Sequence, residues 1–126
     1  MIDHVSLGTH DYARGVAFYE AVLGHIGIVL RRDTGKEAAF GVGDDWSFFL
    51  YPVEAEKAVA AAGMHLALGA ASRSQVRAAY ASALEKGAAD IFAPRERPDV
   101  SATYYGAMFS DPDGHRIEVT TDAAEG

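Results

Sequence analysis

The 126-residue sequence contains no cysteine, which excludes a disulfide framework and any metal site built on thiolates. Metal ligands would have to be His, Asp or Glu, a set that suits zinc, manganese, nickel, iron or cobalt. Long apolar runs are also missing, because no stretch approaches the roughly 18 residues that a membrane-spanning helix needs. The first residues, "MIDHVSLGTHD", lack the basic and apolar regions of a signal peptide. We therefore expect a cytoplasmic protein that does not bind membranes.

Positive charge is scarce, since 11 Lys and Arg residues face 18 Asp and Glu residues and the net charge is −7. No basic cluster offsets this balance, and nucleic-acid binding requires a cationic surface, so that class of partner is excluded. Hydrophobic residues make up 49% of the chain and charged residues 23%, the composition of a globular protein. The length predicts a single domain over residues 1–126 with an ordinary core.

The sequence contains an internal repeat. A shift of 61 residues aligns residues 4–23 with residues 65–84 without a gap, and six of the twenty positions are identical. The identical pairs are His4 and His65, Leu7 and Leu68, Gly8 and Gly69, Ala17 and Ala78, Tyr19 and Tyr80, and Leu23 and Leu84. A shift of 69 aligns residues 38–50 with 107–119, so the second copy carries eight more residues. We place this insertion in "PRERPDVS" (94–101), which has loop composition.

Each copy shows the pattern of one strand, one helix and three further strands. We expect helices at 11–23 and 72–86 and strands at about 2–9, 26–32, 37–43, 46–52, 63–70, 88–93, 102–110 and 115–121. Asp11 and Ser72 are expected N-caps, with Ser72 and Gln75 forming a capping box, and Gly24 and Gly87 are expected at the helix C-termini.

This pattern predicts an α+β fold of two tandem βαβββ modules that form a cupped sheet with the helices on its outer face. Module 1 covers about residues 1–52, the connector covers residues 53–62, and module 2 covers about residues 63–122. The "DPDG" segment (111–114) is expected to form the turn before the last strand.

Strand alternation predicts which face the repeated histidines occupy. In the first strand Val5 and Leu7 share one face, which the helix must cover, and His4 therefore points to the other face. The same parity applies to His65 in the second copy, where Leu66 and Leu68 take the helix side.

The last strand supplies a carboxylate on the same face. Ile117 and Val119 take the helix side, so Glu118 points into the cup, and it lies beside His65 if the first and last strands of a module are neighbours. Two histidines and one carboxylate form the ligand set of an open metal site. The alternative interpretation is that His4, His65 and Glu118 are ordinary polar residues on a solvated sheet face.

The preceding strand adds three residues to the cup: Tyr104, Gly106 and Met108. Tyr104 is a candidate acid/base or a candidate hydrogen-bond donor to the substrate. The alternative is that it packs at the edge of the cup without a chemical role. By the same parity Phe49, Tyr51 and Met108 are expected to line an apolar pocket.

Charged residues in the insertion have two interpretations. Arg95 and Arg97 either contact an anionic substrate at the mouth of the pocket or are solvated charges balanced by Glu96 and Asp99. The remaining histidines, His10, His25 and His115, are expected at the surface.

The segments "DHVSLGTHDYARGVAFYEAVLG", "MHLAL" and "DPDGHRIEV" resemble the first, fifth and last strand segments of the vicinal oxygen chelate superfamily. This superfamily includes glyoxalases, fosfomycin-resistance thiol transferases, extradiol dioxygenases and bleomycin-resistance proteins. The resemblance covers nearly the whole chain and implies paired βαβββ modules around a divalent metal. It places His4, His65 and Glu118 at ligand positions. It also implies a homodimer, in which His4 completes either the site of its own chain or that of a partner chain.

The resemblance also has departures. Enzymes of the glyoxalase I type use a fourth carboxylate ligand at the position of Phe49, so a four-ligand lactoylglutathione lyase is disfavoured. Most extradiol dioxygenases are longer, with an extra pair of modules. The three-ligand pattern is most similar to the fosfomycin-resistance branch, whose hydroxyl residue falls at Ser6, but the cationic phosphonate-binding residues of that branch are not recognisable.

The candidate ligand set and the resemblance together leave two possible functions. The first is a metal-dependent enzyme of the lyase, thiol transferase or dioxygenase type that acts on a small oxygen-rich substrate. The second is a metal-free binding protein that sequesters a small molecule or an antibiotic, as the bleomycin-resistance branch does. A sequestering protein has no need of His4, His65 and Glu118 together, so this ligand set favours the enzyme.

Overall fold

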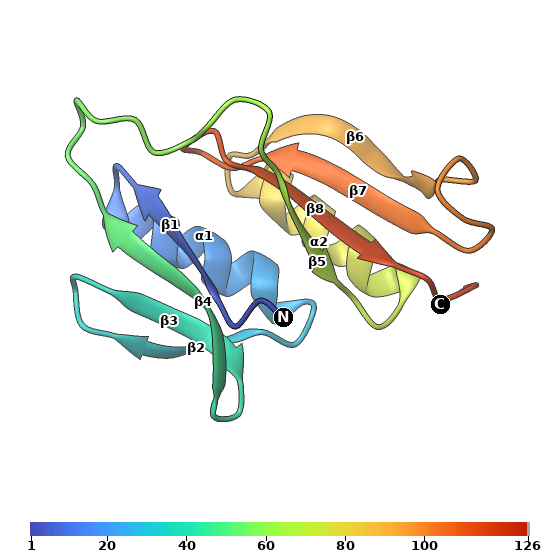
Figure 1. Ribbon diagram of the computed structural model, residues 1–126, viewed down its shortest axis with the longest axis horizontal. Helices are drawn as coiled ribbons and strands as arrows, with labels where there is room; N and C mark the ends of the chain where they lie inside the picture. Colours follow the sequence, from blue (N-terminus) through green and yellow to red (C-terminus); the bar gives the residue numbers. More distant parts are fainter. Residues whose placement is uncertain (126) are drawn as a thin grey trace.

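The computed structural model describes residues 1–125, which form two four-stranded sheets with one helix against each (Figure 1). The first module contains β1 (Val5–Thr9), α1 (Tyr12–Gly24), β2 (Val29–Asp33), β3 (Ala38–Val42) and β4 (Asp45–Pro52). The second contains β5 (Leu66–Gly69), α2 (Arg73–Glu85), β6 (Ala89–Glu96), β7 (Tyr105–Ser110) and β8 (Arg116–Thr121). The predicted α+β fold of two tandem βαβββ modules is confirmed.

The two sheets have the same topology. Their strand orders are β1-β4-β3-β2 and β5-β8-β7-β6, so the first and last strands of each module are neighbours. These neighbours run parallel, and the other pairs run antiparallel. Backbone pairing begins at Val5 and Leu66, so His4 and His65 each lie one residue before their strand, not within it as the predicted bounds have them.

The insertion of the second module extends its hairpin. Strands β2 and β3 with their turn cover residues 29–42, whereas β6 and β7 with their loop cover residues 89–110, eight residues more. The predicted loop at 94–101 is only part of this extension, because β6 continues through Glu96 and the loop covers residues 97–104. Pairing of Arg95 and Glu96 with β7 keeps these residues extended.

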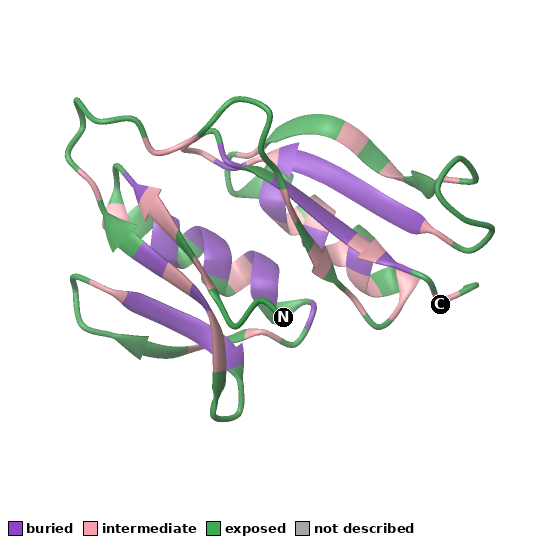
Figure 2. Cartoon of the chain, viewed as in Figure 1, coloured by how far each residue is buried: buried purple, intermediate pink, exposed green. Residues whose placement is uncertain are grey.

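One apolar core joins the modules. Helices α1 and α2 contact each other, and the rings of Phe18 on α1 and Phe109 on β7 meet edge to face at 6.1 Å. Figure 2 shows the buried residues concentrated on β3, β7 and the inner faces of the helices, while the edge strands β2 and β6 are largely exposed. Within residues 1–125, neither helix combines the length and apolar character needed to cross a membrane.

The helix ends follow the sequence signals, except that the side chain of Gln75 accepts from the backbone N–H of Ala71 and not from that of Ser72, so only half of the predicted capping box forms. The side chains of Asp11 and Ser72 accept hydrogen bonds from the backbone N–H groups of Arg14 and Gln75, as N-caps do. Gly87 follows the C-terminus of α2 with a φ of +104°. Gly24 is the last residue of α1, one position before the C-cap His25, and Gly27, with a φ of +83°, follows in the left-handed region.

The turn before β8 ties the second module to the first. The backbone N–H of Gly114 donates to the carbonyl of Asp111 at 2.9 Å and closes the predicted turn. From module 1, the hydroxyl of Tyr19 donates to the carboxylate of Asp111, and the backbone N–H of His10 donates to that of Asp113 at 2.9 Å. Desolvation by burial raises the pKa of Asp111, and its hydrogen bond with Tyr19 opposes this shift.

His115 completes this link. Its Nε2 atom lies 2.7 Å from the carbonyl oxygen of Gly8 on β1, and because a carbonyl only accepts, Nε2 carries the proton. The residue is 8% exposed, so the prediction that His115 lies at the surface is wrong. Position beside a turn indicates exposure in general, but here the turn packs against the first module. His10 and His25 are exposed as predicted.

Candidate metal centre

The candidate site is centred on the carboxylate of Glu118 in β8. Glu118 pairs with Ala67 of β5 on one side and with Met108 of β7 on the other. Its neighbours Ile117 and Val119 belong to the core, so Glu118 lies on the opposite face of the sheet, as strand alternation predicts. Glu118 is only 5% exposed, and a buried carboxylate requires polar partners.

The two oxygens of Glu118 have different partners. Oε1 lies 3.3 Å from Nε2 of His65, and Oε2 accepts a hydrogen bond of 2.6 Å from the hydroxyl of Tyr104. Burial and the hydrogen bond to Glu118 raise the pKa of Tyr104, so this phenol is protonated at neutral pH. The sequence predicts both that Glu118 lies beside His65 and that Tyr104 shares their face, and the geometry agrees.

The spacing of His65 and Glu118 fits two ligands of one divalent cation. Protein nitrogen and oxygen ligands lie about 2.0–2.2 Å from Zn²⁺, so two of them at a tetrahedral angle are about 3.3 Å apart. The observed separation of Nε2 and Oε1 is 3.3 Å. The side chain of His65 is 44% exposed, so this donor is accessible to solvent. The donor set therefore fits a metal ion with open positions.

His4 does not join these two residues in the chain. Its ring packs edge to face on Phe49 of β4 with centroids 5.1 Å apart, and its Nδ1 lies 2.7 Å from a carboxylate oxygen of Asp3. The two sheets stand side by side with both helices behind them (Figure 1). Within residues 1–125, no group of three His, Asp or Glu side chains is arranged to hold a metal ion.

The two modules carry equivalent but unequal pairs. Phe49 pairs with Ser6 just as Glu118 pairs with Ala67, so the contact of His4 with Phe49 is the counterpart of the contact of His65 with Glu118. Because phenylalanine has no coordinating atom, the first module offers a single donor, His4, where the second offers two.

On the second module, Met108 lies beside Glu118, and Arg97 contacts other residues. Met108 is buried on β7 opposite Glu118. Arg97 forms two hydrogen bonds to Asp99, at 3.0 and 2.9 Å, and stacks on Phe92 at 5.1 Å. Asp99 thus balances the charge of Arg97, as the interpretation of these residues as solvated loop charges expects. Glu96 instead pairs with Arg73 of α2. Arg95 also stacks on Phe92, at 4.7 Å.

On the first module, Ser6 and Tyr51 lie near the face of Phe49. The hydroxyl of Tyr51 donates to Glu37 at 2.8 Å, and this bond is the main reason that the pKa of Tyr51 is raised. Ser6 is exposed and is close enough to hydrogen-bond the same hydroxyl.

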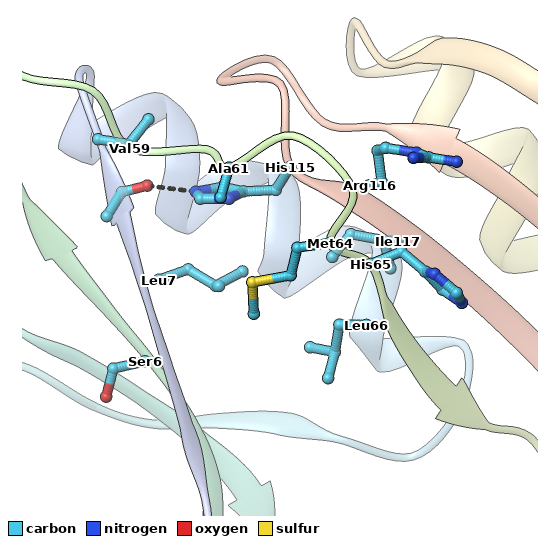
Figure 3. Close-up of a pocket in the computed structure, with 11 residues that line it drawn as sticks. Ser6, Leu7, Val59, Ala61, Met64, His65, Leu66, His115, Arg116 and Ile117 are labelled. Atoms are coloured by element: carbon cyan, nitrogen blue, oxygen red, sulfur yellow. Dashed lines mark hydrogen bonds between the residues drawn. The ribbon is translucent and has the colours of Figure 1, made fainter.

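A cavity of about 170 Å³ lies at the seam between the modules (Figure 3). Its lining comes from β1, the connector, β5 and β8: Ser6, Leu7, Gly8, Val59, Ala61, Met64, His65, Leu66, His115, Arg116 and Ile117. Figure 3 shows Met64 pointing toward Leu7 while the imidazole of His65 points the other way. A second cavity, of about 250 Å³, is lined in part by His4. Phe49, Tyr51, Met108 and Arg97, the predicted pocket residues, line neither of these cavities.

Val59 and Ala61 of the connector and Met64, two residues before β5, belong to this lining although the sequence does not indicate a pocket there. Their segment has no periodic pattern, and nothing in its composition indicates that it folds over the seam.

The structure thus combines two tandem βαβββ modules with a histidine next to a buried carboxylate on the open face of the second module. The chain belongs to the Glyoxalase/Bleomycin resistance protein/Dioxygenase superfamily, whose family model matches residues 1–119. The predicted resemblance is confirmed.

The comparisons with individual proteins agree with this assignment. The chain is 33% identical over 121 residues to "Metallothiol transferase FosB" of Shouchella clausii (strain KSM-K16), covering 95% of this chain and 79% of that protein. Among solved structures, a glyoxalase/bleomycin resistance protein from Albidiferax ferrireducens T118 matches with a TM-score of 0.82, at 24% identity over 94% of this chain and 97% of that one. A glyoxalase-related enzyme from Fulvimarina pelagi matches with a TM-score of 0.74, at 16% identity over 96% and 87%. The two structural matches establish the fold.

Proposed function

We propose that this protein is a metal-dependent enzyme of the thiol transferase type that acts on a small, oxygen-rich substrate. The observation that carries the proposal is the 3.3 Å separation of His65 Nε2 and Glu118 Oε1, which suits two ligands of one divalent cation. The 33% identity to a metallothiol transferase supports the thiol transferase type over the lyase and dioxygenase types. The donor set suits zinc, manganese, nickel, iron or cobalt.

His65 and Glu118 of one chain would hold the metal together with His4 of a second copy. When bound, the metal supplies a Lewis acid that polarises substrate oxygens and stabilises negative charge. The chain contains no cysteine, so the thiol comes from a second small molecule. Its sulfur bonds to an electrophilic carbon of the substrate, and the oxygen that leaves this carbon keeps the bonding electrons and takes up the thiol proton.

The chain's other residues bind and orient the substrate in this proposal. Phe49 and Met108 provide apolar walls that exclude water, and Tyr51 extends the wall on the first module. Ser6 offers a hydroxyl to a substrate oxygen. Arg97 contributes little free charge at this site, because Asp99 accepts two hydrogen bonds from its guanidinium.

A homodimer would complete the site. Within one chain, His65 and Glu118 lie together on the second module, whereas His4 lies on the first module. A single chain therefore offers two of the three metal ligands that we expect. A two-fold axis that lays the first module of each copy over the second module of the other would produce two equivalent sites.

Metal analysis tests the site directly. We expect the wild-type protein, purified without chelator and supplied with Zn²⁺, Mn²⁺, Ni²⁺, Co²⁺ or Fe²⁺, to retain about one ion per chain. His4→Ala, His65→Ala and Glu118→Gln should each lose it, and His25→Ala, which alters an exposed histidine past α1, should not. If the wild type retains no more metal than His65→Ala, the metal centre is wrong, and metal-free sequestration of a small molecule becomes the better account.

Subunit mixing tests where His4 acts. A dimer of one His4→Ala chain and one Glu118→Gln chain has a single intact site if the site is shared, because His4 and the His65–Glu118 pair then come from different chains. Co-expression of the two variants should restore metal binding to about a quarter of the wild-type amount per chain, since about half of random dimers are mixed. No restoration would show that the site does not draw on both chains.

A further inference from the structure

The eight-residue extension of the β6–β7 hairpin folds back on itself. The backbone N–H of Arg97 donates to the carbonyl of Tyr104 at 2.8 Å, and the N–H of Val100 donates to the carbonyl of Arg97 at 2.9 Å. These bonds close the loop at its base and hold Tyr104 one residue before the start of β7. The position of Tyr104 is therefore set by hydrogen-bonded backbone, not by a free loop.

The extension delivers the hydroxyl of Tyr104 to Glu118. The distance from this hydroxyl to Oε2 is 2.6 Å, that of a strong hydrogen bond to a charged acceptor. Two residues further on, on the same face of β7, Gly106 leaves room for the carboxylate, since a Cβ atom there would lie 3.2 Å from Oε2. Tyr104, just before β7, thus provides a donor for Oε2, and Gly106 within β7 provides the space that this oxygen occupies.

The first module serves as an internal comparison. Its β2–β3 hairpin lacks the extension, and the residue equivalent to Glu118 is Phe49, which has no oxygen to hold. Within this chain, the hairpin extension thus occurs in the module that has the carboxylate.

We propose that Tyr104 is a positioning residue that reserves Oε2 of Glu118, so that the carboxylate offers only Oε1 to a metal beside His65. This inference rests on the proposed metal-dependent function. It assigns the Tyr104 hydroxyl to the carboxylate and not to the substrate. A carboxylate that binds through one oxygen suits ions with few, short bonds such as Zn²⁺, whereas Ca²⁺ favours many oxygens and readily takes both oxygens of a carboxylate. Tyr104 therefore sets the selectivity of the site against large cations.

Tyr104→Phe tests this role, with Tyr105→Phe as the matched control. Tyr105 is the next residue, is buried on the opposite face, and places its hydroxyl 3.5 Å from Nη1 of Arg77. Calorimetric titration of the full-length protein with Zn²⁺ and with Ca²⁺ gives the ratio of the two affinities. We expect Tyr104→Phe to reduce the preference for Zn²⁺ about tenfold, the effect of one hydrogen bond to a charged group. Tyr105→Phe should keep the wild-type ratio.

A second variant and a metal-free measurement keep the test decisive. Gly106→Ala keeps the hydroxyl but crowds Oε2, and it should shift the same ratio in the same direction. In the metal-free protein, the ¹³C chemical shift of the Glu118 carboxyl should change in Tyr104→Phe and stay unchanged in Tyr105→Phe. Thermal unfolding of each metal-free variant shows that it is folded.

The outcomes separate this inference from the proposed function. If the wild type binds Zn²⁺ and Tyr104→Phe keeps the wild-type ratio of affinities, the positioning role is overturned while the metal centre stands. If the wild type binds neither ion, the metal centre fails and the positioning role fails with it.

Discussion

The Nε2–H group of His115 donates a 2.7 Å hydrogen bond to the carbonyl oxygen of Gly8, which joins the second module to the first strand of the first module (Figure 3). The bond is largely shielded from water, because His115 is 8% exposed. With the contacts of Tyr19 with Asp111 and of His10 with Asp113, it makes the turn at 111–114 the polar junction between the modules.

Replacing His115 should weaken this junction. His115→Ala removes the only side-chain donor that the structure gives the Gly8 carbonyl within the described residues, and it leaves space at the seam. We expect a loss of about 1–3 kcal/mol in the free energy of unfolding, measured by urea denaturation. His25→Ala, at an exposed histidine, should change it by less than about 0.5 kcal/mol. Equal effects of the two substitutions would contradict a structural role for His115.

Tyr19 and Tyr51 differ in burial although both hydroxyls donate to a carboxylate. Tyr19 is fully buried and bonds to Asp111, while Tyr51 is exposed and bonds to Glu37. Tyr19→Phe leaves a buried carboxylate with one donor fewer and should cost about 1.5–3 kcal/mol of unfolding free energy. Tyr51→Phe should cost less than about 1 kcal/mol, because water replaces its partner. A thermal or chemical denaturation series on the two variants makes the comparison, and a cost for Tyr51→Phe as large as that for Tyr19→Phe would refute it.

Two glycines should respond oppositely to alanine. A Cβ atom at Gly41 would lie 2.1 Å from the backbone oxygen of Asp45, and backbone cannot move aside as a side chain can. Gly41→Ala should therefore destabilise the protein by about 1–3 kcal/mol or more. Gly24, at the end of α1, has open space around its Cα, so Gly24→Ala should be neutral or stabilise by up to about 1 kcal/mol. Denaturation midpoints of both variants test this, and a stable Gly41→Ala variant would show that β3 and β4 lie less close together.

The protein should lose stability above pH 10. Burial and the hydrogen bond to Asp33 raise the pKa of Tyr12 to about 12, and the hydrogen bond to Asp90 followed by burial raises that of Tyr80 to about 12. An unfolded tyrosine ionises near pH 10, so between about 10 and 12 the folded state keeps protons that the unfolded state releases. The free energy of unfolding should therefore fall as the pH rises through this window.

Ultraviolet absorbance of phenolate, followed during alkaline titration of the folded protein, provides the measurement. Phenolate formation should lag behind that of the unfolded chain. Tyr12→Phe with Tyr80→Phe should reduce the pH dependence of stability but not remove it, because the pKa of Tyr19 is also raised. Folded tyrosines that titrate together with unfolded ones would contradict the prediction.

Most of the fold and part of the site are predictable from local patterns. The repeat of His4 and His65 with their flanking residues indicates two modules, and hydrophobic periodicity places their strands and helices in order. The pairing of His65 with Glu118 follows from two rules, alternation along strands and adjacency of the first and last strands of a module. Alternation depends only on backbone geometry, so the sequence was sufficient for it, whereas the adjacency of the two strands was an assumption that the sheet topology confirms.

The tertiary structure decided the rest, because it depends on contacts between segments that carry no shared pattern. Packing of α1 on α2 and the contacts of the turn at 111–114 place the two sheets side by side, and this separates His4 from His65 and Glu118 within one chain. The same packing buries His115, which its position beside a turn does not predict. The hydrogen bond from Tyr104 to Glu118 depends on how the loop at 97–104 closes. Backbone hydrogen bonds close this loop, and no periodic pattern in the sequence predicts them.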